Sequence, residues 1–279
     1  MKIVVCIKQV PDTTEVKIDP VTNNLVREGI PSIMNPFDES ALAAALRLRE
    51  KAGGTVTLVS MGPLQVRKEL EKGLRMGADR AVLVSDRRLG GADTLATGYA
   101  LAQTIERLGF DLVLCGNEAI DGCTGQVGPM IGEFLHIPAF TYVSSIETDG
   151  RGIRVCRRTE KWEETYRAEV PAVACLLKSR PDAEAVEKDS EKEIEIWNAD
   201  YMDESRIGTV GSPTKVAAIS VSERARNYLE VDYSWDLDKR MEYIFNGGLE
   251  VKHQPLRRGT KEKLAHELLR EGWAEYDSL

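Results

Sequence analysis

Apolar residues in the first half of the chain follow two alternating patterns. Short runs rich in valine, leucine and isoleucine are almost continuously apolar, which indicates strands that are buried on both faces. These runs are residues 2–8, 54–62, 80–86 and 110–116. Between them, apolar residues recur at helical spacing over 35–54, 63–79 and 91–109. We therefore expect an α/β fold, a doubly wound parallel sheet with helices on both faces, whose ligands bind beyond the carboxyl ends of the strands.

The pattern changes after about residue 139. Residues 139–170 read as an antiparallel β meander with turns at Asp149-Gly150 and near Lys161, and a last buried strand, AVACLLK, follows Pro171. The segment PDAEAVEKDSEKEIE (181–195) is almost entirely charged or small, so it predicts an exposed loop. We expect an α/β nucleotide-binding domain over residues 1–185, meander included, and a charged loop with an extended C-terminal arm over residues 186–279.

Two segments of the arm have apolar faces but too little mass for a domain of their own. LDKRMEYIFNGG predicts a short helix with Leu237, Met241, Ile244 and Phe245 on one face, and TKEKLAHELLREGW predicts another with Leu264, Leu268 and Leu269. We expect the arm to pack on another subunit. The alternative is that it folds back on its own sheet.

Composition excludes several classes of protein. A net charge of −8 over 279 residues, without a basic stripe, argues against nucleic-acid binding. Three distant histidines and five scattered cysteines make neither a zinc motif nor a disulfide framework. Lys8 and Gln9 interrupt the apolar N-terminus before it reaches signal-peptide length. No run approaches the roughly 18 apolar residues of a membrane span, so we expect a cytoplasmic protein without membrane insertion.

The stretch CGNEAIDGCTGQVGP (115–129) lies between a predicted strand and a predicted helix that begins around Thr124 to Gln126. The first amides of a helix have no internal partner and favour anions. Gly122, Gly125 and Gly128 let a phosphate approach closely, while Thr124 and Gln126 add donors. The alternative is a loop whose glycines satisfy turn angles and whose Asp121 or Thr124 is a plain N-cap.

A second stretch, LGGADTLATGYALA, has the same character after the strand of residues 80–86. Thr94 and Thr97 share a face of the first helical turn, where both hydroxyls can reach one anion. Two helix starts at one sheet edge fit a pyrophosphate better than a single phosphate. The alternative is that Asp93 caps the helix and the threonines face solvent.

Other residues converge on the same edge. Asn35 and Pro36 fit the N-cap and first position of a helix without any ligand. Ser60, Met61 and Gly62 end a strand, where small or flexible side chains could hold a flat ring, and Cys6 lies at the end of the first strand. The alternative for each is a purely structural role. Dinucleotide, P-loop and ATP-pyrophosphatase signatures are missing, and no catalytic triad can be built from three distant histidines.

Together these motifs resemble the β (small) subunit of electron transfer flavoproteins, the EtfB/FixA family. The resemblance covers most of the chain and rests on strings in the same order: KIVVCIKQVPDT, IMNPFDESALAAALRLRE, VSMGP, GLRMGADRAVLV, GADTLAT, AIDGCTGQVGP and RIGTVGSPTKV. It implies a heterodimer with a larger α subunit that carries an FAD. In many members the β subunit holds AMP, whereas an electron-bifurcating subset holds a second FAD there and takes hydride from NADH.

The resemblance also implies a set of site residues. Cys6, Asn35, Ser60 and Met61 would surround the adenosine, and Asp121, Gly122, Thr124, Gly125, Gln126 and Val127 would hold phosphate. Thr94 and Thr97 would serve chiefly where a pyrophosphate replaces one phosphate. The short 121–126 loop combined with DTLAT resembles the FAD-binding, bifurcating and nitrogen-fixation-linked members, so we expect FAD rather than AMP.

The acidic 181–195 segment departs from the apolar anchor and lysine-rich docking segment common in the family. Either it is simply a solvated loop, or the redox partner differs from an ordinary acyl-CoA dehydrogenase. Two alternatives to an FAD-binding, bifurcating subunit stay open. They are a non-bifurcating flavoprotein subunit with structural AMP and a universal-stress-type regulatory module. Against the latter, its glycine-rich phosphate pattern is absent and it offers no use for the arm.

Overall fold

The computed structural model describes residues 1–12, 31–150, 152–179, 192–215, 231–232 and 234–245. The chain divides into two compact units, Met1–Ser220 and Val221–Leu279. The first unit holds the sheet and the candidate site. In the second, the described residues include one helix.

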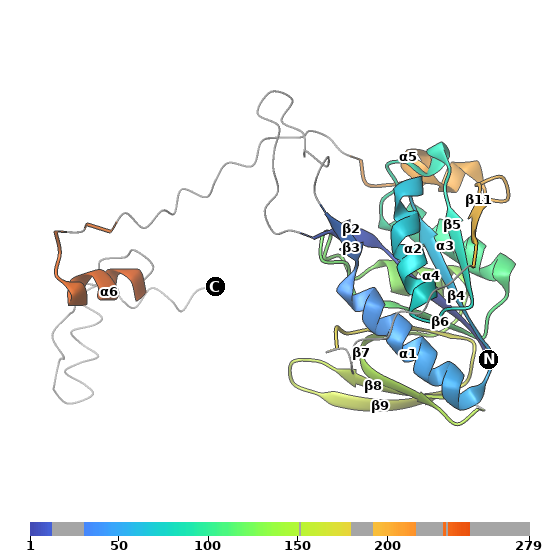
Figure 1. Cartoon of the computed structure of the whole chain (residues 1–279), viewed down its shortest axis with the longest axis horizontal. Helices are drawn as coiled ribbons and strands as arrows, with labels where there is room; N and C mark the ends of the chain where they lie inside the picture. Colours follow the sequence, from blue (N-terminus) through green and yellow to red (C-terminus); the bar gives the residue numbers. More distant parts are fainter. Residues whose placement is uncertain (13–30, 151, 180–191, 216–230, 233, 246–279) are drawn as a thin grey trace, which may run out of the picture. The chain divides into compact units, whose positions relative to one another are not determined.

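Within the described residues, the first unit is built on a nine-stranded sheet (Figure 1). The strand order is β11-β5-β4-β1-β6-β10-β7-β8-β9. Neighbouring strands pair in parallel from β11 to β7 and antiparallel from β7 to β9. The parallel strands are β1 (Lys2–Cys6), β4 (Thr55–Met61), β5 (Arg80–Val84), β6 (Leu112–Gly116), β7 (Ala139–Thr148), β10 (Ala172–Leu176) and β11 (Ile194–Trp197). The doubly wound parallel sheet predicted from the sequence is confirmed.

Helices cover both faces of this sheet. On one face, α1 (Pro36–Ala52) and α2 (Arg67–Arg75) pack against alternate strand residues such as Ile3 and Val5. On the other face, α3 (Thr94–Leu108) and α4 (Val127–Phe134) pack against the intervening residues such as Val4. Because successive strand residues point to opposite faces, this division explains why the strands are continuously apolar.

The meander is also confirmed, and it extends the main sheet. Strands β8 (Ile153–Arg158) and β9 (Glu163–Ala168) continue from β7, and the predicted turn contains Gly150 at φ 85°. Strand β10 returns between β6 and β7. A separate antiparallel pair, β2 (Gln9–Pro11) and β3 (Ser32–Met34), was not predicted.

The sheet-bearing unit extends further along the chain than the boundary expected at residue 185. Strand β11 pairs with β5, and after it come η3 (Glu204–Arg206) and α5 (Gly208–Gly211). Ala199, Met202 and Ile207 are buried in the core that α3 covers. Residues 192–215 therefore follow the alternative considered above, in which part of the arm folds back on its own sheet.

The second unit contains the first of the two helices expected in the arm, α6 (Leu237–Phe245). Its four predicted apolar side chains are all exposed, with Phe245 at 79%. The helix expected over 260–273 and most of the acidic segment lie outside the described residues. Among the helices of the described part, none is both long and apolar enough to cross a membrane.

Candidate functional site

A cavity of about 570 Å³ opens at the carboxyl edge of the parallel strands, between the first turns of α3 and α4. This volume falls within the range of about 300–1,000 Å³ that is typical of cofactor and ligand sites. Ten of the twelve residues expected at the site line it: Cys6, Asn35, Met61, Thr94, Thr97, Gly122, Thr124, Gly125, Gln126 and Val127. The topology thus brings together residues that are widely separated in the sequence.

The other two expected residues, Ser60 and Asp121, do not line the cavity. Ser60 is buried within β4, and strand alternation places it on the sheet face opposite to that of its neighbour Met61. The Asp121 carboxylate forms an ion pair of 2.6 Å with the Lys8 ammonium group. Asp121 therefore ties the loop that precedes α4 to the end of the first strand.

The start of α4 has the features of an anion site. The helix begins at Val127, slightly later than predicted, and its N-cap residue Gln126 makes no side-chain capping bond. No described residue accepts a hydrogen bond from the Val127 or Gly128 amide. A β-carbon at Gly122 would meet nothing within 4 Å, so there is open space beside the loop. Free amides at a helix N-terminus beside open space suit a phosphate group.

The start of α3 is different, because Asp93 already caps it. Its carboxylate accepts hydrogen bonds from the Leu95 and Ala96 amides at 3.0 Å each. Burial would raise the pKa of Asp93, but hydrogen bonds from the amides of Ala96, Thr214 and Leu95 outweigh burial and leave the pKa below its usual value. The capping alternative for Asp93 is confirmed. Helix α3 therefore presents hydroxyl groups to the cavity rather than a fully open set of amides.

A hydrogen bond joins the two helix starts. The Thr94 hydroxyl donates to Gln126 Oε1 at 2.8 Å, and both residues line the cavity. Thr97 lies one turn further along α3 and lines the same cavity. The two glycine-rich stretches of the sequence thus form one site.

Asn35 has a role that its N-cap position does not predict. It precedes Pro36 at the start of α1, as expected, but its side chain makes no capping bond. Instead, its Nδ2 donates to the Glu118 carbonyl at 2.9 Å, and its Oδ1 accepts from the Ile120 amide at 3.3 Å. The amide side chain therefore holds the loop that leads to α4.

Sequence reasoning missed Asp38, a buried carboxylate that lines the cavity. Its two oxygens accept the backbone amides of Gly116 at 2.9 Å and Lys8 at 2.7 Å. Burial raises the pKa of Asp38 to about 7, against the opposing effect of hydrogen bonds from Lys8, Asn35 and Gly116. An acidic residue in a first helical turn is common, so the sequence offers no signal that this one is buried.

Cysteine thiols form part of the cavity floor. Cys6 and Cys115 line it, and Cys115 Sγ lies 3.6 Å from Cys175 Sγ. Burial, with the nearby Asp38 and Cys175, raises the pKa of Cys6 well above its usual range. The Cys175 hydrogen bond, followed by burial, does the same for Cys115. The thiols remain protonated, so they provide small apolar surface rather than nucleophiles.

Comparison with known proteins identifies the family. Residues 22–201 match the electron transfer flavoprotein domain. The β subunit of the electron transfer flavoprotein of Clostridium acetobutylicum is 47% identical over 230 residues, which cover 80% of this chain and 89% of that protein. The chain belongs to the electron transfer flavoprotein family.

Two further relatives place it in the β-subunit branch, which includes the FixA proteins. Protein FixA of Azorhizobium caulinodans is 42% identical over 252 residues, covering 84% of this chain and 89% of that protein. Subunit CarD of the caffeyl-CoA reductase-Etf complex of Acetobacterium woodii is 43% identical over 225 residues, covering 77% and 86%. As an electron transfer flavoprotein β subunit, the chain is not a universal-stress-type module.

Proposed function

We propose that this β subunit forms a heterodimer with an electron transfer flavoprotein α subunit and binds FAD in the cavity between α3 and α4. In this proposal NADH is the hydride donor, and the electrons are divided between a high-potential flavin in the α subunit and a low-potential acceptor. The names of similar proteins support the assembly, because they are β subunits and, in one case, a subunit of a reductase-Etf complex.

The observation that carries the FAD proposal is the Thr94–Gln126 hydrogen bond across the cavity. It brings the hydroxyl-bearing start of α3 next to the open start of α4. The Val127 and Gly128 amides would hold one phosphate. Thr97 would donate to the other, and so would Thr94 once its single hydroxyl proton turns from Gln126 to the phosphate. A helix N-terminus stabilises a nearby negative charge by about 0.3–1 kcal/mol.

Bound FAD would supply the hydride-accepting and electron-transferring chemistry, and the protein would bind and orient it. Asn35 holds the loop before α4 through Glu118 and Ile120. Asp38 joins the ends of β1 and β6 by accepting the Lys8 and Gly116 amides. These contacts fix the walls of the site, and hydride transfer requires no side-chain base.

A specific observation favours AMP as the second candidate. Asp93 occupies the Leu95 and Ala96 amides, so α3 offers a second phosphate only hydroxyl groups. The start of α4 alone is sufficient for the single phosphate of AMP. In that case the subunit would belong to a non-bifurcating flavoprotein.

The first test counts nucleotides in the purified heterodimer. FAD in both subunits gives two flavins per heterodimer, and the double change Thr94→Ala and Thr97→Ala should reduce this number to about one, because the second phosphate loses both hydroxyl donors. Acid extraction followed by chromatography separates FAD from AMP. Gln103→Ala is a matched control, since Gln103 lies on α3 without lining the cavity. One flavin and one AMP in the unmutated complex would establish the second candidate instead.

A further inference from the structure

Residues 198–214, here called the strap, run from the end of β11 to the cavity. Buried Ala199, Met202 and Ile207 pack with Tyr99 of α3 and with Leu89. The Asp203 amide donates to the Tyr99 hydroxyl at 3.1 Å, and the Tyr201 and Thr104 hydroxyls are 2.9 Å apart. The strap therefore follows the length of α3 rather than crossing it at one point.

The far end of the strap contacts the start of α3. The Asp93 amide donates to Ser212 Oγ at 2.8 Å, and the Thr214 amide donates to Asp93 Oδ2 at 3.0 Å. Thr214 also lines the cavity. The strap is thus a wall of the site. It also orients Asp93, the capping residue directly before Thr94.

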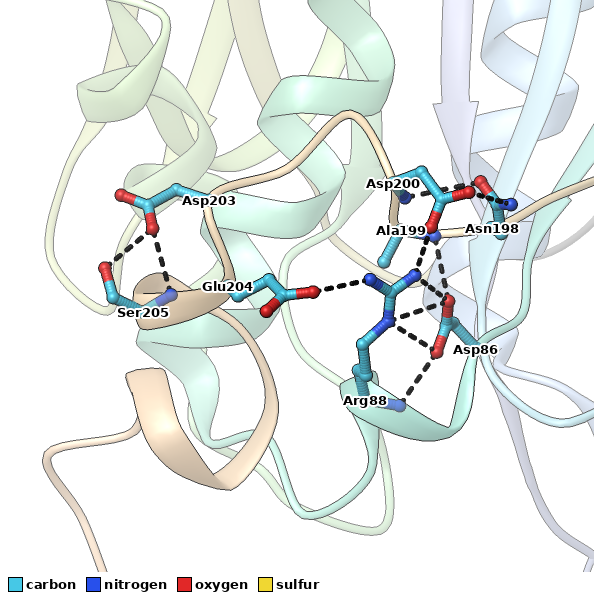
Figure 2. A network of polar contacts seen from close by, with 8 residues as sticks. All are labelled: Asp86, Arg88, Asn198, Ala199, Asp200, Asp203, Glu204 and Ser205. Carbon is cyan, nitrogen blue, oxygen red and sulfur yellow. Dashed lines mark hydrogen bonds and ion pairs between the residues drawn. The ribbon is translucent and has the colours of Figure 1, made fainter.

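An arginine fixes the near end of the strap. Figure 2 shows the Arg88 guanidinium between three carboxylates, one on its own turn and two on the strap. Its nitrogens lie 2.6 Å from Asp86, 2.5 Å from Asp200 and 2.7 Å from Glu204. Asp86 also accepts the Ala199 amide at 3.1 Å. One planar guanidinium therefore serves two segments more than 100 residues apart in the sequence.

The backbone of the same turn, η2 (Arg87–Leu89), provides a second contact. Gly208 has φ 55° and lies so close to the Arg88 carbonyl that a β-carbon there would overlap it. The Thr209 amide donates to the Gly90 carbonyl at 3.1 Å. Gly208 and Thr209 therefore attach the strap to this turn. Along the strap, they lie between the residues that contact the Arg88 guanidinium and the residues that reach the cavity.

Three carboxylates share the single Arg88 cation as their ion-pair partner. Without the guanidinium, Asp86, Asp200 and Glu204 would repel one another at short range. Because two of them belong to the strap, this repulsion would push the strap away from η2. The contacts of Ser212 and Thr214 with Asp93 would then lose their support.

We propose that Arg88 is a positioning residue for the nucleotide: by holding the strap on η2, it keeps Ser212 and Thr214 on Asp93 and retains the nucleotide in the cavity. This inference rests on the proposed function, in that it requires a nucleotide at this site. It assigns to the strap the control of nucleotide release, whether the nucleotide is FAD or AMP.

The test measures nucleotide retention in the heterodimer that carries Arg88→Gln. The FAD and AMP that remain bound are counted at intervals during dialysis, and hydrogen–deuterium exchange is measured over 198–214. We expect release to be on the order of 10-fold faster than from the unmutated complex, with faster exchange in the strap. Arg88→Lys keeps the charge and should restore part of the retention.

Arg80→Gln is the matched control. Arg80 makes a bidentate ion pair with Glu195 at 2.6 and 2.8 Å, which ties the start of β5 to β11 at a place that does not line the cavity. This variant removes an ion pair that anchors β11, the strand directly before the strap. We expect it to leave the release rate close to that of the unmutated complex.

The outcomes separate this inference from the proposed function. An unmutated complex that neither holds nor takes up FAD or AMP would overturn both. An unmutated complex that holds nucleotide, with Arg88→Gln releasing it no faster than Arg80→Gln, would overturn the role of Arg88 alone. If Arg88→Gln does not fold, the double variant Asp200→Ala and Glu204→Ala removes both strap acceptors of Arg88 and is subject to the same criterion.

Discussion

Asp38 shows how one side chain can organise a site without being recognisable in the sequence. Its carboxylate accepts amides from the ends of two adjacent strands, at Lys8 and Gly116. A carboxylate has enough lone pairs for both bonds, whereas an asparagine would place an amide N–H against one of the two donors. The buried charge is costly, which is why its pKa is raised to about 7.

The raised pKa gives a stability prediction with a defined sign. The usual pKa of an unfolded aspartate is about 3.9, so the folded protein binds the extra proton between that value and the folded value of about 7. The contribution of Asp38 to the free energy of unfolding is therefore fully present below about pH 4 and is lost as the pH rises through 7. From about pH 6 to about pH 8 the loss exceeds about 1 kcal/mol.

Asp38→Asn should remove this part of the pH dependence, because asparagine does not titrate. Urea unfolding of both proteins at the two pH values measures the effect. The unmutated protein should lose its advantage over the variant as the pH rises. A difference in unfolding free energy that stays constant between the two pH values would contradict the assignment.

At the scale of elements, α3 and α4 begin in the same cavity with different chemistry. Asp93 neutralises the start of α3, while the side chain of Gln126 accepts from Thr94 instead of capping α4. An uncapped helix start is less stable than a capped one. Helix α4 therefore gives up stability at the position where a phosphate could take the place of a cap.

Replacing Gln126 with Asp should separate stability from binding. As an N-cap, aspartate should stabilise the nucleotide-free protein by about 0.5–1 kcal/mol, while its charge repels phosphate. We expect the dissociation constant for AMP or FAD in the nucleotide-stripped heterodimer to rise more than about 10-fold. Gln126→Asn is the matched control, because it caps without charge and also loses the Thr94 bond. Equal weakening by Asp and Asn would contradict an anion site.

At the scale of the whole molecule, local sequence patterns predicted the parallel sheet. They did not predict contacts between distant segments, which depend on the topology of the fold. The runs that form β1, β4, β5 and β6 are continuously apolar, so their burial could be predicted from the sequence. Strand β11 was missed because an edge strand buries little, and its Glu195 and Ile196 are exposed. Thr214 was missed at the site because its contact with Asp93 spans 121 residues. Thr214 and Asp93 come into contact only in the folded chain.

The exposed face of α6 gives a prediction about assembly. In the described part of its unit, Leu237 and Phe245 are 64% and 79% exposed. If α6 packs on the α subunit, Leu237→Glu with Phe245→Glu should prevent recovery of a stable heterodimer, because each buried side chain contributes roughly 1.5–3 kcal/mol. Co-purification of a tagged α subunit measures this. Asp238→Lys, an exposed change on the same helix, should leave the yield unchanged, and normal recovery of the double variant would contradict the assignment.

The meander leaves β9 as one outer strand of the sheet. An unpaired strand edge is a template on which further chains can add, the first step toward fibres. Here Glu163, Glu164 and Arg167 occupy that strand, with Glu163 and Glu164 paired to arginines of β8. A second copy docking along this edge would have to desolvate those charges. The meander can therefore lengthen the sheet and still leave a border that resists polymerisation during synthesis, before any partner has bound.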